Sequence, residues 1–195
     1  MKQLDRVKFV TISGRTGVGK STLFEALLNQ YPDVFQPVLS YTTRARRVGD
    51  ESAYRYCTEE VFRALEEKGE FAWTATVLGN HFGTLITDLV TTQEAAKTSL
   101  MVLTPETIRV LRYTIDPSRC CHFYLLAPPD EIVLEHRLRV RGGMSQEMIR
   151  QRLAEDRTWD GEAERSGLPF QFIPSTLSKE GVFERVVEFL KGTET

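Results

Sequence analysis

The chain has 195 residues, of which 41% are hydrophobic and 27% are charged, and its formal net charge is −2. This length suits one domain with a substantial core, and the composition is that of a globular protein rather than a disordered one. The nearly balanced charge gives no electrostatic case for a nucleic-acid or membrane partner, and no hydrophobic run approaches membrane-spanning length.

The cysteines and the first residues indicate a compartment. Cys57, Cys120 and Cys121 are odd in number and have no metal-like spacing. The adjacent pair begins an apolar run, so we expect its members to be buried thiols. Residues 1–6 lack the apolar core of a signal peptide. Free thiols are typical of a reducing environment, and we therefore expect a cytoplasmic protein.

The first predicted unit is a strand at 7–12, a glycine-rich loop at 14–21 and a helix from about residue 22. The loop has the pattern G-x-x-x-x-G-K-S of the phosphate-binding P-loop. Its glycines allow backbone N–H groups to turn inward around an anion, and the helix start adds its positive dipole end. Lys20 can reach the β- and γ-phosphates, and the Ser21 hydroxyl can ligate Mg²⁺. We therefore expect a nucleoside triphosphate to be bound by Gly14, Arg15, Thr16, Gly17, Val18, Gly19, Lys20, Ser21 and Thr22.

Short elements follow. Val38–Thr42 has the composition of a strand, and the basic segment after it has no apolar period and indicates an exposed loop. A capping pattern at Thr58 predicts an amphipathic helix that stops near Gly69. We expect a strand at 71–78, a turn at Gly79–Asn80 and a helix from 85 to about 96.

The rest of the chain alternates strands with helices. Apolar runs at 100–103 and 123–126 predict buried strands. The later predicted elements are a helix beginning at Thr104–Glu106, a helix at 132–141 ended by Gly142–Gly143, a long helix from Ser145 to about Glu164, a strand at 170–173 and an amphipathic helix at 182–190. This alternation predicts an α/β sandwich with a mainly parallel sheet.

Three arginines suggest more than triphosphate binding. Arg137 and Arg141 are four residues apart and share one helix face, and Arg152 lies on the next helix. After the flexible Gly142–Gly143, these guanidiniums could close over transferring phosphates as a lid. Since several glutamates are available as partners, a solvated basic helix face is an equally good explanation from the spacing alone.

From the P-loop to the last helix, the chain resembles the guanylate kinase family. The matching segments keep the family's order and spacing. They are 14–23 for the S-G-x-S-G-x-G-K-S-T-L opening, 40–50 for S-x-T-T-R-x-P-R-x-G-E, 70–71 and 79–84 for E-F and G-N-x-Y-G-T, 127–142 for P-P-S…R-L-x-x-R-G, and Arg152–Leu153 for the following R-L.

The resemblance implies an architecture and an activity. The fold would be a single P-loop NTPase-type domain over 1–195, with a mainly parallel sheet, a small acceptor-binding subdomain and a helical lid. The core would be about 1–37, 85–130 and 165–195, the acceptor-binding region about 38–84 and the lid about 137–160. The protein, a monomer or homodimer, would transfer a phosphoryl group from ATP, with Mg²⁺ on Ser21, to a nucleoside monophosphate. Its catalytic residues would be Lys20, Arg137, Arg141 and Arg152.

The acceptor half matches the family in part. Arg44 and Arg47 resemble the family's clamp on the acceptor phosphate, and paired guanidiniums suit bidentate phosphate contact. Tyr54 can take the place of a phosphate-binding tyrosine, whereas Phe82 stands where a second tyrosine belongs. The residues that resemble the family's guanine-binding hydroxyls are Ser40 and Thr84.

Three departures from the family concern the base. Trp73 stands in place of the glutamate that reads guanine, Val102 in place of a supporting aspartate and Thr104 in place of a second aspartate near the metal. A buried base donor left without an acceptor costs about 1–3 kcal/mol, so these changes alter recognition of the base but not of the phosphates. We expect Trp73 to stack on the acceptor or to wall it off.

Three functions therefore compete. The first, which we favour, is a nucleoside monophosphate kinase that acts on GMP or a related nucleotide. The second is a sugar-phosphate kinase similar to ribose 1,5-bisphosphate phosphokinases, and the third is a non-catalytic nucleotide-binding protein. Arg47 and the intact Thr42–Arg44 favour the nucleotide, and the intact P-loop argues against loss of catalysis.

Overall fold

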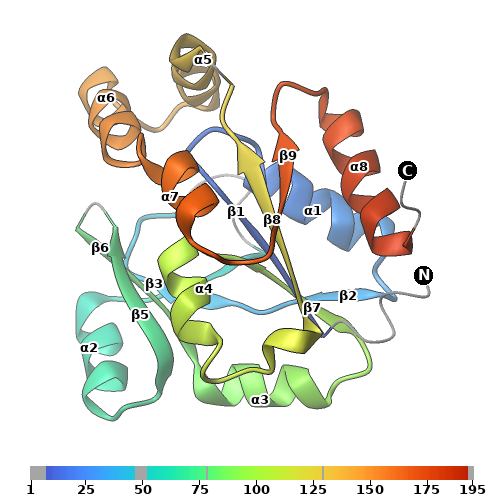
Figure 1. Ribbon diagram of the computed structural model, residues 1–195. Helices are drawn as coiled ribbons and strands as arrows, with labels where there is room; N and C mark the ends of the chain where they lie inside the picture. The colour runs from blue at the N-terminus through green and yellow to red at the C-terminus, as the bar shows by residue number, and fades with distance from the viewer. Residues whose placement is uncertain (1–7, 47–51, 78, 129, 193–195) are drawn as a thin grey trace.

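A parallel sheet lies at the centre of the molecule. The computed structural model describes residues 8–46, 52–77, 79–128 and 130–192 (Figure 1). The central sheet has five strands in the order β2-β7-β1-β8-β9, and every pairing in it is parallel. This confirms the α/β fold with a mainly parallel central sheet. The strands are β1 (Phe9–Gly14), β2 (Phe35–Pro37), β7 (Thr98–Val102), β8 (Cys120–Leu126) and β9 (Phe170–Pro174).

Helices cover both faces of this sheet, which explains why β1 is buried along its whole length. All six residues of β1 are buried. Val10 and Ile12 face one hydrophobic cluster and Phe9 faces the other, as the period of two in a strand requires. The first cluster includes residues of α1 (Lys20–Gln30) and α8 (Lys179–Lys191); the second includes residues of α3 (Ile86–Glu94), α4 (Pro105–Leu111) and α7 (Trp159–Arg165).

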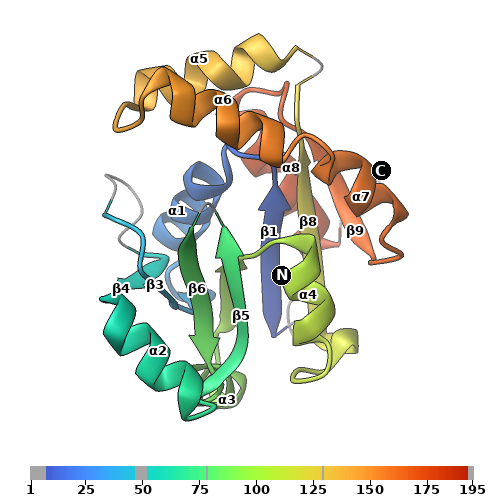
Figure 2. The same ribbon diagram turned by 90° about the vertical axis from the view of Figure 1, so that its left-hand side faces the viewer.

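A second, smaller sheet stands beside the first (Figure 2). Its strand order is β4-β3-β6-β5, and its strands are β3 (Ser40–Thr42), β4 (Tyr54–Tyr56), β5 (Phe71–Val77) and β6 (Asn80–Leu85). Helix α2 (Glu59–Glu67) begins at Thr58, whose side chain accepts a hydrogen bond from the Val61 N–H as the capping pattern predicted. Phe62 is fully buried and stacks on Phe71, with ring centroids 4.6 Å apart.

Two helices lie across the carboxyl ends of the central strands. They are α5 (Glu131–Arg141) and α6 (Gln146–Glu155), and both views show them above the end of β1. Gly142 ends α5 with a φ of 73°, a conformation that favours glycine. Leu134 and Leu138 of α5 and Ile149 and Leu153 of α6 belong to the same hydrophobic cluster as β1. The pair of helices α5 and α6 is therefore packed on the core of the domain.

The sequence-based elements were wrong in several places, and β4 and β6 were not predicted as strands at all. The helix predicted from Ser145 to Glu164 is two helices, α6 and α7, because Asp156 turns inward between them and is only 2% exposed. The chain around the predicted strand at 38–42 forms two short strands, β2 and β3, which belong to different sheets. Strand β2 forms because it pairs with β7, and β3 because it pairs with β6. These partners are far away in the sequence, so no local pattern predicts the two strands.

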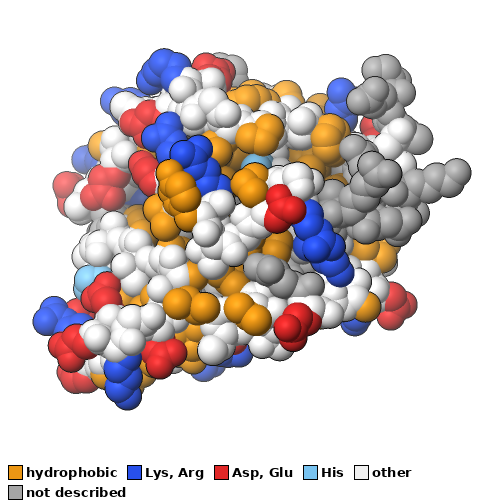
Figure 3. All heavy atoms as spheres, turned by 60° about the horizontal axis from the view of Figure 1, so that its bottom comes forward, with side chains coloured by type: hydrophobic (Ala, Val, Ile, Leu, Met, Phe, Trp, Pro, Cys, Tyr) orange, Lys and Arg blue, Asp and Glu red, His pale blue; other side chains and the backbone are white. Residues whose placement is uncertain are grey.

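Three further features concern membrane-spanning helices, the cysteines and one face of the surface. Within the described residues, no helix has both the length and the apolar character needed to cross a membrane. All three cysteines are free thiols; Cys121 is buried and the other two are partly buried. On the face that carries α3, hydrophobic, acidic and basic side chains are interspersed (Figure 3), and Ile86 and Val90 are exposed there.

The central sheet yields a stability prediction from two phenylalanines. Phe123 on β8 is fully buried and packs edge-to-face on Phe189 at 5.5 Å, whereas Phe172 on β9 is 37% exposed. We expect Phe123→Ala to lower the free energy of unfolding by about 3–5 kcal/mol, because it leaves a cavity that the core cannot fill. Phe172→Ala, the matched control, should cost about 1 kcal/mol. Urea denaturation would measure both, and equal losses would contradict this description of the core.

Candidate active site

The P-loop wraps the carboxyl end of β1 and leads into α1. Gly14 has a φ of 135°, and a Cβ at this position would lie 2.5 Å from the Leu125 carbonyl oxygen on β8. Only glycine suits this backbone, which explains the first glycine of the motif. Lys20, at the first turn of α1, donates to the carbonyl oxygens of Gly14 at 2.7 Å and Arg15 at 2.8 Å. The lysine therefore already lies over the loop.

A broad cleft lies beside the P-loop and contains the three predicted lid arginines. It is lined by residues 16–23 of the loop and α1, by Arg137 and Arg141 of α5, and by Arg152 of α6. Arg137 donates to the Gly17 carbonyl oxygen at 3.4 Å and to the Ser175 carbonyl oxygen at 3.1 Å. These side chains line the cleft, Arg141 being exposed and Arg137 partly buried, and their action as a lid stays a prediction.

Electrostatics make this cleft a site for anions. Burial lowers the pKa of the Arg152 guanidinium from its usual value, and the positive charges of Arg44 and Arg141 lower it further. Arginine nonetheless stays protonated at neutral pH. Like charges held this close repel each other, so an anion bound among them is favoured. The arrangement suits phosphate groups.

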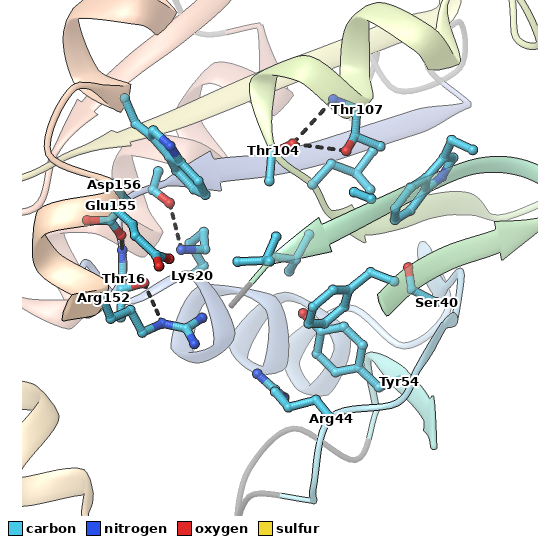
Figure 4. Close-up of a pocket in the computed structure, with 18 residues that line it drawn as sticks. Thr16, Lys20, Ser40, Arg44, Tyr54, Thr104, Thr107, Arg152, Glu155 and Asp156 are labelled. Atoms are coloured by element: carbon cyan, nitrogen blue, oxygen red, sulfur yellow. Dashed lines mark hydrogen bonds between the residues drawn. The ribbon is translucent and has the colours of Figure 1, made fainter. Parts of the chain in front are cut away.

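A buried carboxylate joins the end of α6 to the P-loop. Asp156 follows α6 and accepts hydrogen bonds from Arg15 Nε at 3.2 Å and from the Thr16 backbone N–H. The Arg15 guanidinium, 7% exposed, also contacts Glu131 of α5 and the Leu153 carbonyl oxygen. Nearby, Arg152 Nε donates to Thr16 Oγ1 at 2.9 Å (Figure 4). The predicted ATP-binding residue Arg15 thus directs its side chain into the lid.

A second pocket opens from the P-loop toward the smaller sheet. Its far end is lined by Ser40, Tyr54, Trp73, Phe82 and Val102, and Lys20 and Arg152 line its near end. Figure 4 shows Ser40 and Tyr54 on the opposite side of the pocket from Thr16 and Arg152. Phosphate-binding and apolar surfaces therefore meet in one continuous space.

Arg44 lies between the two ends of this pocket. It is 8% exposed, and its guanidinium stacks on the Tyr54 ring at 5.0 Å and on the Phe82 ring at 5.9 Å. Such cation–π contacts fix the direction of the guanidinium. Phe82, which lacks the hydroxyl of the expected tyrosine, therefore has a positioning role that needs only its ring.

The remaining predicted site residues have different placements. Val18, Ser21 and Thr22 all line the cleft, but Val18 is only 3% exposed and its side chain also packs in the core. Thr84 is fully buried behind Ser40 and hydrogen-bonds its hydroxyl at 3.0 Å. Arg47 lies outside the described residues.

Sequence reasoning missed several lining residues. Asp156 was hidden in a charged segment, where nothing distinguishes one buried acid from exposed ones. The hydroxyls of Thr104 and Thr107 are 2.9 Å apart in the pocket wall, and Thr104 also caps α4. Trp159 lines the pocket from the start of α7. Two signals were available for Thr104, its N-cap pattern and its place where the family has an aspartate near the metal.

The comparisons with known proteins agree on one family. A model of the family described as guanylate kinase matches residues 6–173. The guanylate kinase of Nitratidesulfovibrio vulgaris is 36% identical over 141 residues, which are 71% of this chain and 66% of that protein. The guanylate kinase of Schizosaccharomyces pombe is 32% identical over 165 residues, 83% of this chain and 80% of that protein. The crystal structure of guanylate kinase from Anaplasma phagocytophilum, 18% identical, superposes with a TM-score of 0.65 over 97% of this chain and 87% of that chain, which shows the same fold.

The buried Asp156 yields a prediction about the lid. We expect Asp156→Ala to lower the free energy of unfolding by about 3–5 kcal/mol, because it leaves the buried Arg15 guanidinium with less compensating charge. Asp130→Ala removes an exposed carboxylate that caps α5 and should cost about 1 kcal/mol. Denaturant titration of the two variants would measure both losses of unfolding free energy. If Asp156→Ala loses no more than Asp130→Ala, the contact of Asp156 with the P-loop is unimportant for stability.

Proposed function

Since the chain belongs to the guanylate kinase family, we propose that it transfers the γ-phosphoryl group of ATP to a nucleoside monophosphate, GMP or a related nucleotide. The observation that carries this proposal is the position of three cations. Lys20, Arg44 and Arg152 line both the cleft beside the P-loop and the pocket beside the smaller sheet. A donor phosphate and an acceptor phosphate would meet at this junction.

The proposed mechanism is direct in-line transfer without a covalent intermediate. Lys20 and the P-loop N–H groups hold the donor phosphates, and Arg137, Arg141 and Arg152 neutralise the charge that spreads over the transferring group. The acceptor oxygen belongs to a phosphate that is already ionised at pH 7, so no general base is needed. The protein's task is to position two anions and offset their repulsion.

Magnesium fits this donor set. Ser21 supplies a hydroxyl oxygen in the cleft next to Lys20, and Mg²⁺ prefers a few such oxygens together with waters and substrate phosphates. Among the described residues, no cluster of three His, Cys, Asp or Glu side chains could hold a metal by itself. We therefore propose that Mg²⁺ is brought with ATP, is ligated by Ser21 and supplies charge neutralisation.

The acceptor phosphate would be held by Arg44 and Tyr54. The stacking of Arg44 on Tyr54 and Phe82 leaves its planar fork preorganised for a phosphate. We add Arg47 to this group from the sequence alone. The base would lie beyond, between Ser40 and Trp73.

Family membership favours the nucleotide over the alternatives. The relatives at 32–36% identity are named guanylate kinases, and this supports neither a sugar-phosphate acceptor nor a non-catalytic role. We further propose that residues 38–84 bind the acceptor, that about 137–160 form the lid and that the protein acts in the cytoplasm. The oligomeric state, monomer or homodimer, stays a prediction.

Removal of the P-loop lysine tests the donor half. We expect Lys20→Ala to reduce kcat by about a thousandfold or more, because charge on the transferring group is then uncompensated. Lys191→Ala, an exposed lysine at the end of α8, should leave kcat unchanged. ADP release from MgATP with GMP as acceptor is the assay. Wild-type turnover in Lys20→Ala would refute the mechanism.

Replacement of Arg44 tests the acceptor half. We expect Arg44→Ala to raise the KM for the acceptor by about tenfold or more while the KM for ATP changes little, since a charge-assisted phosphate contact is lost. Arg46→Ala is the matched control, because Arg46 is exposed and its guanidinium stacks on Tyr56 at 5.1 Å. The proposal fails here if both variants behave alike in steady-state kinetics.

A further inference from the structure

Trp73 lines the acceptor pocket and carries a buried hydrogen-bond donor. The side chain is 7% exposed and lines the pocket, and its indole N–H has no hydrogen-bond partner among the residues that the structure describes. A buried donor without a partner is unfavourable, and a ligand that supplies an acceptor removes the deficit. Because tryptophan donates and never accepts, the ligand atom opposite it must be a hydrogen-bond acceptor.

The donor belongs to a row of side chains that crosses the smaller sheet. Trp73 pairs with Thr84 across β5 and β6, and Ser40 pairs with Tyr54 across β3 and β4. The hydrogen bond between the Ser40 and Thr84 hydroxyls joins the two halves of the row. Paired residues of neighbouring strands project from the same face of a sheet. The row therefore presents a phenol, hydroxyls and an indole N–H to one side.

The opposite wall supplies no carboxylate. It consists of Val102, Leu103 and the mutually hydrogen-bonded Thr104 and Thr107. Of the described residues that line the pocket, the two acidic ones are Glu155 and Asp156, and Figure 4 shows both on the P-loop side, away from Ser40. Asp156 already accepts from Arg15 and Thr16. Among the described residues at the far end, none offers a carboxylate to a base amino group.

We infer that Trp73 reads the acceptor base through a hydrogen-bond acceptor atom on its edge, and that the pocket does not select for an amino group at C2 of a purine. This inference rests on the proposed function. Guanine and hypoxanthine share a carbonyl oxygen and ring nitrogens that can accept from an indole N–H, and they differ at the C2 amino group. Among the nucleotides related to GMP, IMP is the one that lacks only this amino group, so GMP and IMP should be used almost equally.

Steady-state kinetics of GMP and IMP with MgATP test the inference. For the wild-type protein we expect values of kcat/KM that agree within about tenfold. Trp73→Phe keeps a ring and removes the N–H, so kcat/KM should fall about tenfold to a hundredfold for both nucleotides with their ratio unchanged. Trp73→Glu adds the missing carboxylate and should shift the ratio toward GMP by about tenfold or more.

Trp159→Phe is the matched control, since it makes the same change at the other of the two tryptophans. It should keep the wild-type ratio and lose less kcat/KM than Trp73→Phe. Thermal melts by circular dichroism establish that each variant is folded, and the ratio within one variant does not depend on the folded fraction. A wild-type preference for GMP above about a hundredfold overturns the inference, and so does a folded Trp73→Phe with unchanged kcat/KM.

Failure of the proposed function gives a different result. If neither nucleotide releases ADP, the kinase proposal fails, and calorimetric titration with GMP and IMP still decides the inference. Similar affinities for the wild-type protein, both weakened in Trp73→Phe, support reading by the indole N–H. Binding of GMP alone, or equal binding by wild type and Trp73→Phe, overturns it.

Discussion

The buried carboxylate of Asp156 links the P-loop to the end of α6. It accepts from Arg15 and Thr16 of the P-loop, while Arg152, one turn earlier, donates to Thr16. The P-loop and the end of α6 therefore share one buried polar network. Because unpaired charges in such a place are costly, the network sets the position of α6 relative to the loop. The arginine cluster over the cleft depends on that position.

Two different kinds of surface meet at the cluster. The donor side consists of loop backbone and long cationic side chains, which suit phosphates of any nucleotide. The acceptor side consists of the aromatic and hydroxyl groups of the smaller sheet. Lys20, Arg44 and Arg152 border both surfaces, so the charges of two substrates would be offset by the same residues. Recognition of the base is left to side chains that carry no charge.

Sequence reasoning succeeded where the constraint is local. The P-loop is recognisable because close passage beside Leu125 demands glycine at position 14, and the cap of α4 because Thr104 bonds a nearby N–H. The function of Arg137 and Arg141 could not be predicted from their spacing. Two residues on one helix face give no information about what that face contacts in the folded protein. Asp156 was missed for a related reason, because its burial depends on the path of α6 over the P-loop. Short strands such as β3 and β4 depend on distant partners in the same way.

The row from Tyr54 to Trp73 has a consequence for how this protein could change during evolution. Its four strands all come from residues 40–85, one continuous stretch of the chain, whereas the P-loop and the lid come from segments before and after it. Substitutions within this one stretch therefore change one wall of the acceptor pocket, while the wall formed by Val102 to Thr107, the P-loop and α5–α6 stay as they are. The preference for an acceptor can thus vary in this scaffold without changes in the donor half.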